Sequence, residues 1–144
     1  MAKKILILGV NGFIGSSLAW KILNKTDWEV AGVDLGDNKI SHCLGMANFK
    51  FFKKNVLTET EWIEDAVKNC DVVLPLVAIA TPAMYVSDPL RVYNLDYESN
   101  IAIVKLCAKY GKRIVFPSTS EVYGMCPDEN FDEYSSPLVL GPIA

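Results

Sequence analysis

The feature that most constrains this chain is the stretch at residues 5–15, which reads ILILGVNGFIG. Four apolar residues, 5–8, are too few for a helix and are typical of a buried strand. Three glycines follow at once: Gly9, Gly12 and Gly15. Glycines let a turn bring its backbone close to a ligand, and a helix that begins in the turn points free N–H groups and its positive dipole end at the same place. The stretch therefore predicts a phosphate-binding strand, turn and helix.

A second apolar strand over residues 30–33 ends at Asp34, whose carboxylate suits hydrogen bonding to a ribose diol. Together with the glycine turn, this acid fits the adenosine half of NAD. An alternative stays open, in which the glycines only let a helix pack closely on a strand, but the acid favours nucleotide binding. Residues 35–37 include no Arg or Lys, so a 2′-phosphate would meet negative charge alone. The sequence thus favours NAD over NADP.

Length and composition exclude several classes of protein. At 144 residues the chain has the length of one domain, which is short for an enzyme with separate cofactor and substrate domains. No apolar run reaches the roughly 18 residues that span a membrane, and no secretion signal precedes the first strand, so we expect a cytoplasmic protein without membrane insertion. A net charge of −3 without a basic cluster argues against nucleic acid as a partner. The four cysteines form no Cys-x-x-Cys pair, so no metal site is expected.

Strand and helix patterns alternate along the rest of the chain. The expected elements are the helix after the glycine turn, further strands at 30–33, 49–52, 72–77 and 113–116, and a helix at 59–68 with Thr58 as its N-cap. A last helix is expected from 88 to about 111, and it carries the apolar residues Val92, Leu95, Ile101, Val104 and Cys107. This α/β order predicts a Rossmann-type doubly wound parallel sheet with the strand order 3-2-1-4-5. We expect residues 1–124 to form an NAD-binding domain and residues 125–144, rich in Pro, Asp, Glu and Ser, to be loop-like.

Ligands of such sheets bind at the carboxyl ends of the strands. Three segments follow strand ends: the glycine turn, residues 78–81 and residues 118–121. We expect all three to converge. The three hydroxyls and one carboxylate of residues 118–121 would then stand beside a nicotinamide and its substrate, where they could move protons. The same serine-threonine run is also typical of a helix cap or turn, and that alternative stays open.

Four motifs carry a family resemblance. They are the glycine turn, Asp34, Asp88-Pro89 with Asn94, and the block at residues 118–124. With these motifs the chain resembles the extended short-chain dehydrogenase/reductase superfamily of nucleotide-sugar epimerases, dehydratases and decarboxylases. Two longer blocks, residues 71–82 and 116–126, are similar to the UDP-glucuronic acid decarboxylase domains of bifunctional polymyxin-resistance enzymes. The resemblance covers the whole chain.

The resemblance implies that NAD oxidises the C4 hydroxyl of UDP-glucuronate to a ketone and that the resulting β-keto acid loses CO₂. The predicted cofactor-binding residues are Gly9, Asn11, Gly12, Phe13, Ile14, Gly15, Asp34, Asn55, Val56 and Ala78. The predicted substrate-binding residues are Ala80, Tyr85, Thr119 and Ser120, and the predicted catalytic residues are Thr119, Ser120 and Glu121, with Glu121 as the acid/base. The family often has Asp where this chain has Asn55, which keeps one acceptor and adds a donor.

One expected motif is absent. Members of the superfamily use a Tyr-x-x-x-Lys pair, in which the lysine lowers the pKa of the tyrosine that takes the hydroxyl proton. None of the six tyrosines of this chain has a lysine four positions on. The chain thus reads as the front half of an enzyme, which binds NAD, is inactive alone and self-associates through uncovered surface. Two other hypotheses stay open: a free-standing NAD-binding or assembly module, and a different sugar-nucleotide epimerase or dehydratase.

Overall fold

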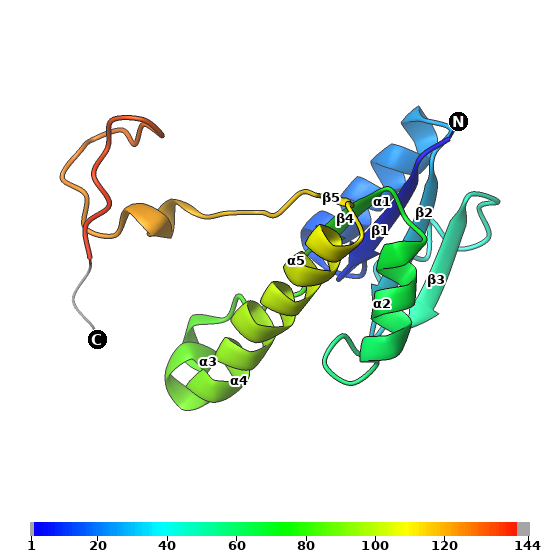
Figure 1. Cartoon of the computed structure of the whole chain (residues 1–144), viewed down its shortest axis with the longest axis horizontal. Coiled ribbons are helices and arrows are strands. Elements are labelled where there is room, and N and C mark those ends of the chain that lie inside the picture. Colours follow the sequence, from blue (N-terminus) through cyan, green and yellow to red (C-terminus); the bar gives the residue numbers. More distant parts are fainter. Residues whose placement is uncertain (1, 141–144) are drawn as a thin grey trace.

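A computed structural model describes residues 2–140. Its five parallel strands form one sheet in the order β3-β2-β1-β4-β5, which confirms the predicted order and the Rossmann-type fold. The strands are β1 (Lys4–Leu8), β2 (Glu29–Asp34), β3 (Phe49–Lys53), β4 (Val72–Pro75) and β5 (Arg113–Ile114). Figure 1 shows α1 on one face of this sheet and α2 and α5 on the other.

Helix α1 (Phe13–Lys25) covers the first face. Ile5 and Ile7 of β1 are buried on this face, and Ala19 and Leu23 of α1 pack in the same cluster. The loop between β2 and β3 completes the cluster with turns in place of a second helix. Each fully buried Leu, Ile or Val side chain contributes roughly 1.5–3 kcal/mol to folding. The glycine turn is therefore mounted on a well-packed strand and helix.

Helices α2 (Thr60–Lys68) and α5 (Ser99–Lys109) cover the second face. Leu6 and Leu8 of β1 are buried here, because successive side chains of a strand point to opposite faces. Ile63 of α2 packs in the same cluster. β1 is thus buried on both of its faces, as its unbroken apolar run predicts.

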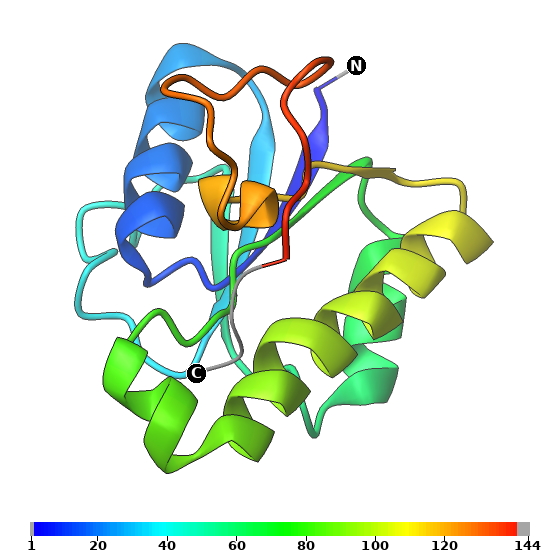
Figure 2. The same cartoon turned by 90° about the vertical axis from the view of Figure 1, so that its left-hand side faces the viewer.

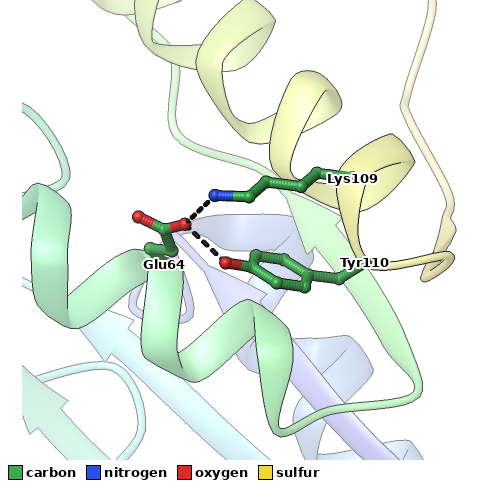
Figure 3. A network of polar contacts seen from close by, with 3 residues as sticks. All are labelled: Glu64, Lys109 and Tyr110. Carbon is green, nitrogen blue, oxygen red and sulfur yellow. Dashed lines mark hydrogen bonds and ion pairs between the residues drawn. The ribbon is translucent and has the colours of Figure 1, made fainter.

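A polar contact joins α2 to the end of α5 (Figure 3). Glu64 Oε1 accepts hydrogen bonds from Lys109 Nζ at 2.7 Å and from the Tyr110 hydroxyl at 2.6 Å. The hydrogen bond from Lys109, followed by that from Tyr110, lowers the pKa of the Glu64 carboxyl, and Glu64 raises the pKa of Lys109. All three groups are partly exposed to water, so the contact orients the two helices more than it stabilises them.

The chain between β4 and α5 differs from the prediction of one continuous helix. It forms α3 (Pro82–Ser87), α4 (Pro89–Tyr93) and a π-helical turn (Asn94–Glu98) before α5. The residues that α5 buries are Ser99, Asn100, Ile103 and Cys107. Of the apolar residues expected on this helix, Cys107 is buried, whereas Val104 is 37% exposed. The wider π-helical turn shifts the helical repeat between Leu95 and the buried positions of α5.

The predicted N-cap of α2 was also wrong. The helix begins at Thr60 with Glu59 at the N-cap position, and no side chain caps it. The carbonyl of Asn55 accepts the N–H groups of both Thr58 and Glu59, so a turn precedes the helix and Thr58 belongs to that turn.

β5 is shorter than the predicted strand at residues 113–116. The N–H groups of Arg113 and Val115 donate to the carbonyls of Asp71 and Val73. By the spacing of these bonds, the next donors of the ladder would be Pro75 and Pro117, and proline has no N–H. The ladder therefore ends, and the following residues leave the sheet.

We call residues 4–114 the sheet body and residues 115–140 the C-terminal segment. Figure 1 shows this segment running away from β5 and folding back on itself far from the helices. It contains a 3₁₀ turn at Ser120–Tyr123 and a single bridge between Gly124 and Val139. The domain boundary predicted after residue 124 stays a prediction, and residues 141–144 lie outside the described residues. Among residues 2–140, no helix is both long and apolar enough to cross a membrane.

Candidate functional site

The glycine turn packs so tightly that two of its glycines have no room for a side chain. Gly9 has a φ of +90°, and a Cβ there would lie 2.9 Å from the backbone of Leu76 and Val77. A Cβ on Gly15 would collide with the carbonyl oxygen of Gly9. Both contacts are with backbone, which cannot move aside as a side chain can. The glycines therefore bring α1, the turn and the end of β4 together.

The first turn of α1 is open to an anion. Gly12 occupies the N-cap position in an extended conformation, and no side chain caps the helix or places an acid in its first turn. The N–H groups of residues 13–15 have no acceptor within the helix and lie at its positive end. The side chains of Phe13 and Ile14 are 85% and 58% exposed, and the predicted role of these residues toward the cofactor stays a prediction. This arrangement suits the diphosphate of a dinucleotide.

Asp34 ties the glycine turn to the end of β2. Its Oδ2 accepts the N–H of Asn11 at 2.9 Å, and its Oδ1 accepts the N–H of Leu35 at 2.7 Å. A carboxylate offers about four acceptor positions, so two stay available for a ribose diol. The bond from Asn11 was not foreseen in the sequence, because it joins a turn and a strand end that are distant along the chain.

The side chain of Asn11 is engaged with the loop after β2. Its Nδ2 donates to Asn38 Oδ1 at 2.8 Å, and its Oδ1 accepts the N–H of Lys39 at 2.7 Å. Asn11 therefore holds the turn and the loop together through its side chain, and its predicted role toward the cofactor stays a prediction.

A cleft of about 290 Å³ lies at the carboxyl ends of the first four strands. Six predicted cofactor-binding residues line it: Gly9, Gly12, Asp34, Asn55, Val56 and Ala78. Three features of the cleft fit NAD. The glycine turn leaves no space for Cβ atoms at Gly9 and Gly15, the first turn of α1 has no side-chain cap, and the Asp34 carboxylate keeps two unused acceptor positions. Two larger hollows lie elsewhere, one beside β2, β3 and α2 and one between α2 and α5, and neither is lined by the glycine turn.

The lining residues that were not predicted include Lys54, Arg91 and Leu95. Residues 35–37, which follow Asp34 in the chain, include no Arg or Lys, but the cleft contains Lys54 and Arg91. Lys54 follows β3, and Arg91 and Leu95 lie one helical turn apart between α4 and the π-helical turn. Because the stretch with Arg91 and Leu95 was predicted as part of a continuous helix, its approach to the cleft was not foreseen.

The segment after β4 is held by two polar residues of the helical region that follows it. Asp96 Oδ1 accepts the N–H of Ile79 at 2.8 Å. Asn100, which is buried, donates from Nδ2 to the carbonyls of Asp96 and Val77. These bonds fix the backbone around Ala78, which lines the cleft. The predicted substrate residues Ala80 and Tyr85 follow on the same stretch and are exposed.

The expected convergence was wrong for its third segment. The glycine turn and the segment after β4 meet at the cleft, but residues 118–121 do not line it. Ser118, Thr119, Ser120 and Glu121 are exposed on the C-terminal segment, where the Glu121 N–H donates to Thr119 Oγ1 at 3.3 Å. Figure 2, turned by 90° from Figure 1, places this segment in front of the sheet body. β5 ends at Ile114, and Val115 N–H makes the last bond to β4, so the ladder does not hold residues 118–121 at the sheet edge.

Two comparisons place the chain among known proteins. The model of the NAD dependent epimerase/dehydratase family matches residues 5–143. The crystal structure of the PbgP3 protein from Burkholderia pseudomallei is similar, with 56% identity and a TM-score of 0.94 over 99% of this chain and 42% of that one.

More distant solved structures share the fold. A UDP-N-acetylglucosamine 4-epimerase from Methanobrevibacter ruminantium M1, in complex with UDP-N-acetylmuramic acid, is 23% identical with a TM-score of 0.84, over 96% of this chain and 44% of that one. A mutant UDP-glucuronic acid 4-epimerase from Bacillus cereus, in complex with a fluorinated UDP-glucuronic acid and NAD, is 24% identical with a TM-score of 0.80, over 97% and 46%. The chain thus spans less than half the length of the solved proteins it matches.

The glycine turn, the acid at the end of β2 and the sheet order all agree with the family match, which covers nearly every residue of the chain. The prediction of NAD as cofactor is confirmed by the same match. The chain therefore belongs to the NAD-dependent epimerase/dehydratase family.

Proposed function

We propose that the chain is the NAD-binding part of a nucleotide-sugar-modifying enzyme that oxidatively decarboxylates UDP-glucuronate to a UDP-4-keto-pentose, as in lipid A modification with aminoarabinose. The observation that carries the proposal is the meeting of the glycine turn, Asp34 and Asn55 at one cleft. The 56% identity to the PbgP3 protein and the resemblance of residues 71–82 and 116–126 to UDP-glucuronate decarboxylases support the choice of reaction.

NAD, when bound, would supply the hydride acceptor for oxidation of the sugar at C4, with the C4 hydroxyl proton passing to a base; the resulting ketone, β to the carboxylate, would allow CO₂ to depart. The residues of this chain bind the cofactor and orient the sugar nucleotide. The first turn of α1 holds the diphosphate, Asp34 the adenosine ribose, and Asn55 with Val56 the adenine edge. Ala80 and Tyr85 contact the sugar nucleotide, and the remaining assigned residues act at the sugar ring: Thr119, Ser120 and Glu121.

Glu121 is the proposed acid/base, and Thr119 and Ser120 the proposed sugar-orienting hydroxyls. Since none of the three lines the cleft, the proposal requires the C-terminal segment to approach the cleft when the substrate binds. The tyrosine-lysine pair of the superfamily does not occur in these 144 residues. We therefore propose that this chain alone binds NAD without turning over the substrate.

Two alternatives have specific support. The exposed position of residues 118–121 favours a free-standing NAD-binding or assembly module. The 4-epimerases among the solved relatives favour a different sugar-nucleotide reaction with the same cofactor half.

The deciding experiment uses a version of the chain extended through a downstream tyrosine-lysine pair, supplied with NAD and UDP-glucuronate or UDP-glucose. Release of CO₂ from UDP-glucuronate alone is the expected result. Interconversion of UDP-glucose and UDP-galactose without CO₂ would instead establish an epimerase, and no reaction with either sugar would favour the module.

The proposal also includes self-association and a cytoplasmic location. Leu90, which is 74% exposed, and Val104 present apolar surface on α4 and α5, and a hollow of about 690 Å³ lies between α2 and α5. Light scattering at high protein concentration should report a species larger than the monomer, and a clean monomer would count against this part of the proposal.

A further inference from the structure

The cleft contains two positively charged side chains in different states. Lys54 Nζ is paired with Glu59 Oε2 at 2.8 Å and lies over the ring of Trp62. Within residues 2–140, the guanidinium of Arg91 has neither an ion-pair nor a hydrogen-bond partner. Arg91 is thus a cation of the cleft whose charge no neighbouring carboxylate neutralises.

The position of Arg91 is fixed by the start of α4. Pro89 occupies the first turn, and the Asp88 carboxylate caps the helix by accepting the Arg91 N–H at 3.3 Å. Leu95, one turn further on, lines the cleft as well, so this face of the helical region is turned toward it. Figure 2 shows α3 and α4, in green, at the same end of the molecule as the start of α1, in blue.

A positively charged side chain in the cleft would balance the charge of a bound diphosphate. A dinucleotide diphosphate carries two negative charges, and the end of a helix dipole supplies only about half a positive charge. Asp34 adds a further negative charge to the same cleft. Lys54 is already neutralised by Glu59, whereas a guanidinium can donate two parallel hydrogen bonds to phosphate oxygens.

We propose that Arg91 is a cofactor-binding residue whose guanidinium pairs with the diphosphate of NAD, across the cleft from the first turn of α1. The inference rests on the proposed cofactor site and adds to it a specific ligand for the phosphates. Arg91 thereby makes binding of the dinucleotide depend on the short helix α4.

The test is a set of calorimetric titrations of the 144-residue chain with NAD, NADP, ADP and adenosine. Arg91→Gln should raise the Kd for NAD and ADP about tenfold, the loss expected for one hydrogen bond to a charged group at a partly exposed site. Adenosine, which lacks phosphate, should bind the variant as it binds the wild type. Arg91→Lys keeps the positive charge but lacks the planar guanidinium, so its Kd for NAD should lie between those of the wild type and Arg91→Gln. Arg113→Gln, which alters the only other arginine, should change nothing.

Each contrary result points to a different error. Equal NAD binding by wild type and Arg91→Gln would overturn the inference and leave the cofactor site standing. An equal loss for adenosine would show that Arg91 shapes the cleft without contacting phosphate, and a loss for NADP alone would place it at the ribose; either result overturns the inference. Failure of the wild type to bind NAD and ADP would overturn the proposed site itself.

Discussion

The sheet body and the C-terminal segment position their side chains in different ways. In the sheet body, ladder hydrogen bonds and two buried clusters hold residues that are distant along the chain, so Gly9, Asp34 and Ala78 meet at one cleft. In the C-terminal segment the contacts are local. The ring of Tyr123 stacks on the ring of Phe131, with 4.7 Å between the ring centroids. Tyr134 and Leu140 are 96% and 97% exposed.

Local order in the segment does not place it against the sheet. Asp132 Oδ1 accepts the N–H groups of Tyr134 and Ser135, both at 2.9 Å, and these bonds lower the pKa of the Asp132 carboxyl. Such turns fix the local conformation of the C-terminal segment, but they do not fix its position relative to the sheet body. The cofactor half of the site is therefore a property of the sheet body, whereas the proposed catalytic half depends on how the segment docks.

The largest expected effect concerns turnover. The 144-residue chain should form no detectable NADH from UDP-glucuronate and NAD. The tyrosine-lysine pair, whose tyrosine would take the C4 hydroxyl proton, does not occur in these 144 residues, and a general base supplies about 10²–10⁴-fold in rate. Positioning of the reacting groups is worth roughly 7 kcal/mol or more in addition. Absorbance of NADH is the measurement, beside the chain extended through a tyrosine-lysine pair. Comparable rates for the two would show that the sheet body and the segment suffice for catalysis.

The next effect tests the tight packing of the glycine turn. Gly15→Val should abolish NAD binding and destabilise the fold by roughly 1–3 kcal/mol, because the new side chain meets the carbonyl of Gly9. Ser17→Val, at an exposed position of the same helix, is the matched control and should bind NAD normally. Calorimetry and thermal unfolding give both quantities. Wild-type affinity in Gly15→Val would mean that NAD does not bind at this turn.

A smaller loss is expected at Asp34. Asp34→Ala removes the acceptor for the ribose and for the N–H groups of Asn11 and Leu35, so the Kd for NAD should rise at least about tenfold while the domain stays folded. Asp37→Ala removes a nearby exposed acid and should leave the Kd unchanged. The wild type should also bind NAD more tightly than NADP. Equal affinities for the two dinucleotides would remove the ribose contact from the account.

The smallest effect lies outside the cleft, at the contact between α2 and α5. The pKa of the Glu64 carboxyl is lower in the folded state than in the unfolded chain, because Lys109 and Tyr110 donate hydrogen bonds to it. The stabilisation from this contact is therefore fully present above the unfolded pKa and is lost as the pH falls through the folded pKa. Glu64→Gln should therefore lower Tm slightly at pH 7 and hardly at all at pH 3. Asp65→Asn, one residue on, serves as the control in thermal scans. A Tm difference that grows toward low pH would contradict the assignment.

Much of the sheet body could be predicted because its signals are local. The apolar runs of β1 and β4, the glycines and the acid at the end of β2 each have a meaning independent of distant residues. The π-helical turn and the position of Arg91 could not be predicted from the sequence, because both depend on the path of the chain between β4 and α5. The end of β5 was in principle readable from Pro75 and Pro117, but only once the register of the two strands was known.

The most direct test of the difference between the two regions is an NMR titration of the isotope-labelled chain with NAD. At NAD concentrations that saturate the site, we expect amide shift changes at Gly9, Gly12, Asp34, Asn55 and Ala78, and none within residues 125–140. Shift changes centred on residues 118–140, or none in the glycine turn at saturating NAD, would contradict the claim that the sheet body alone forms the cofactor site.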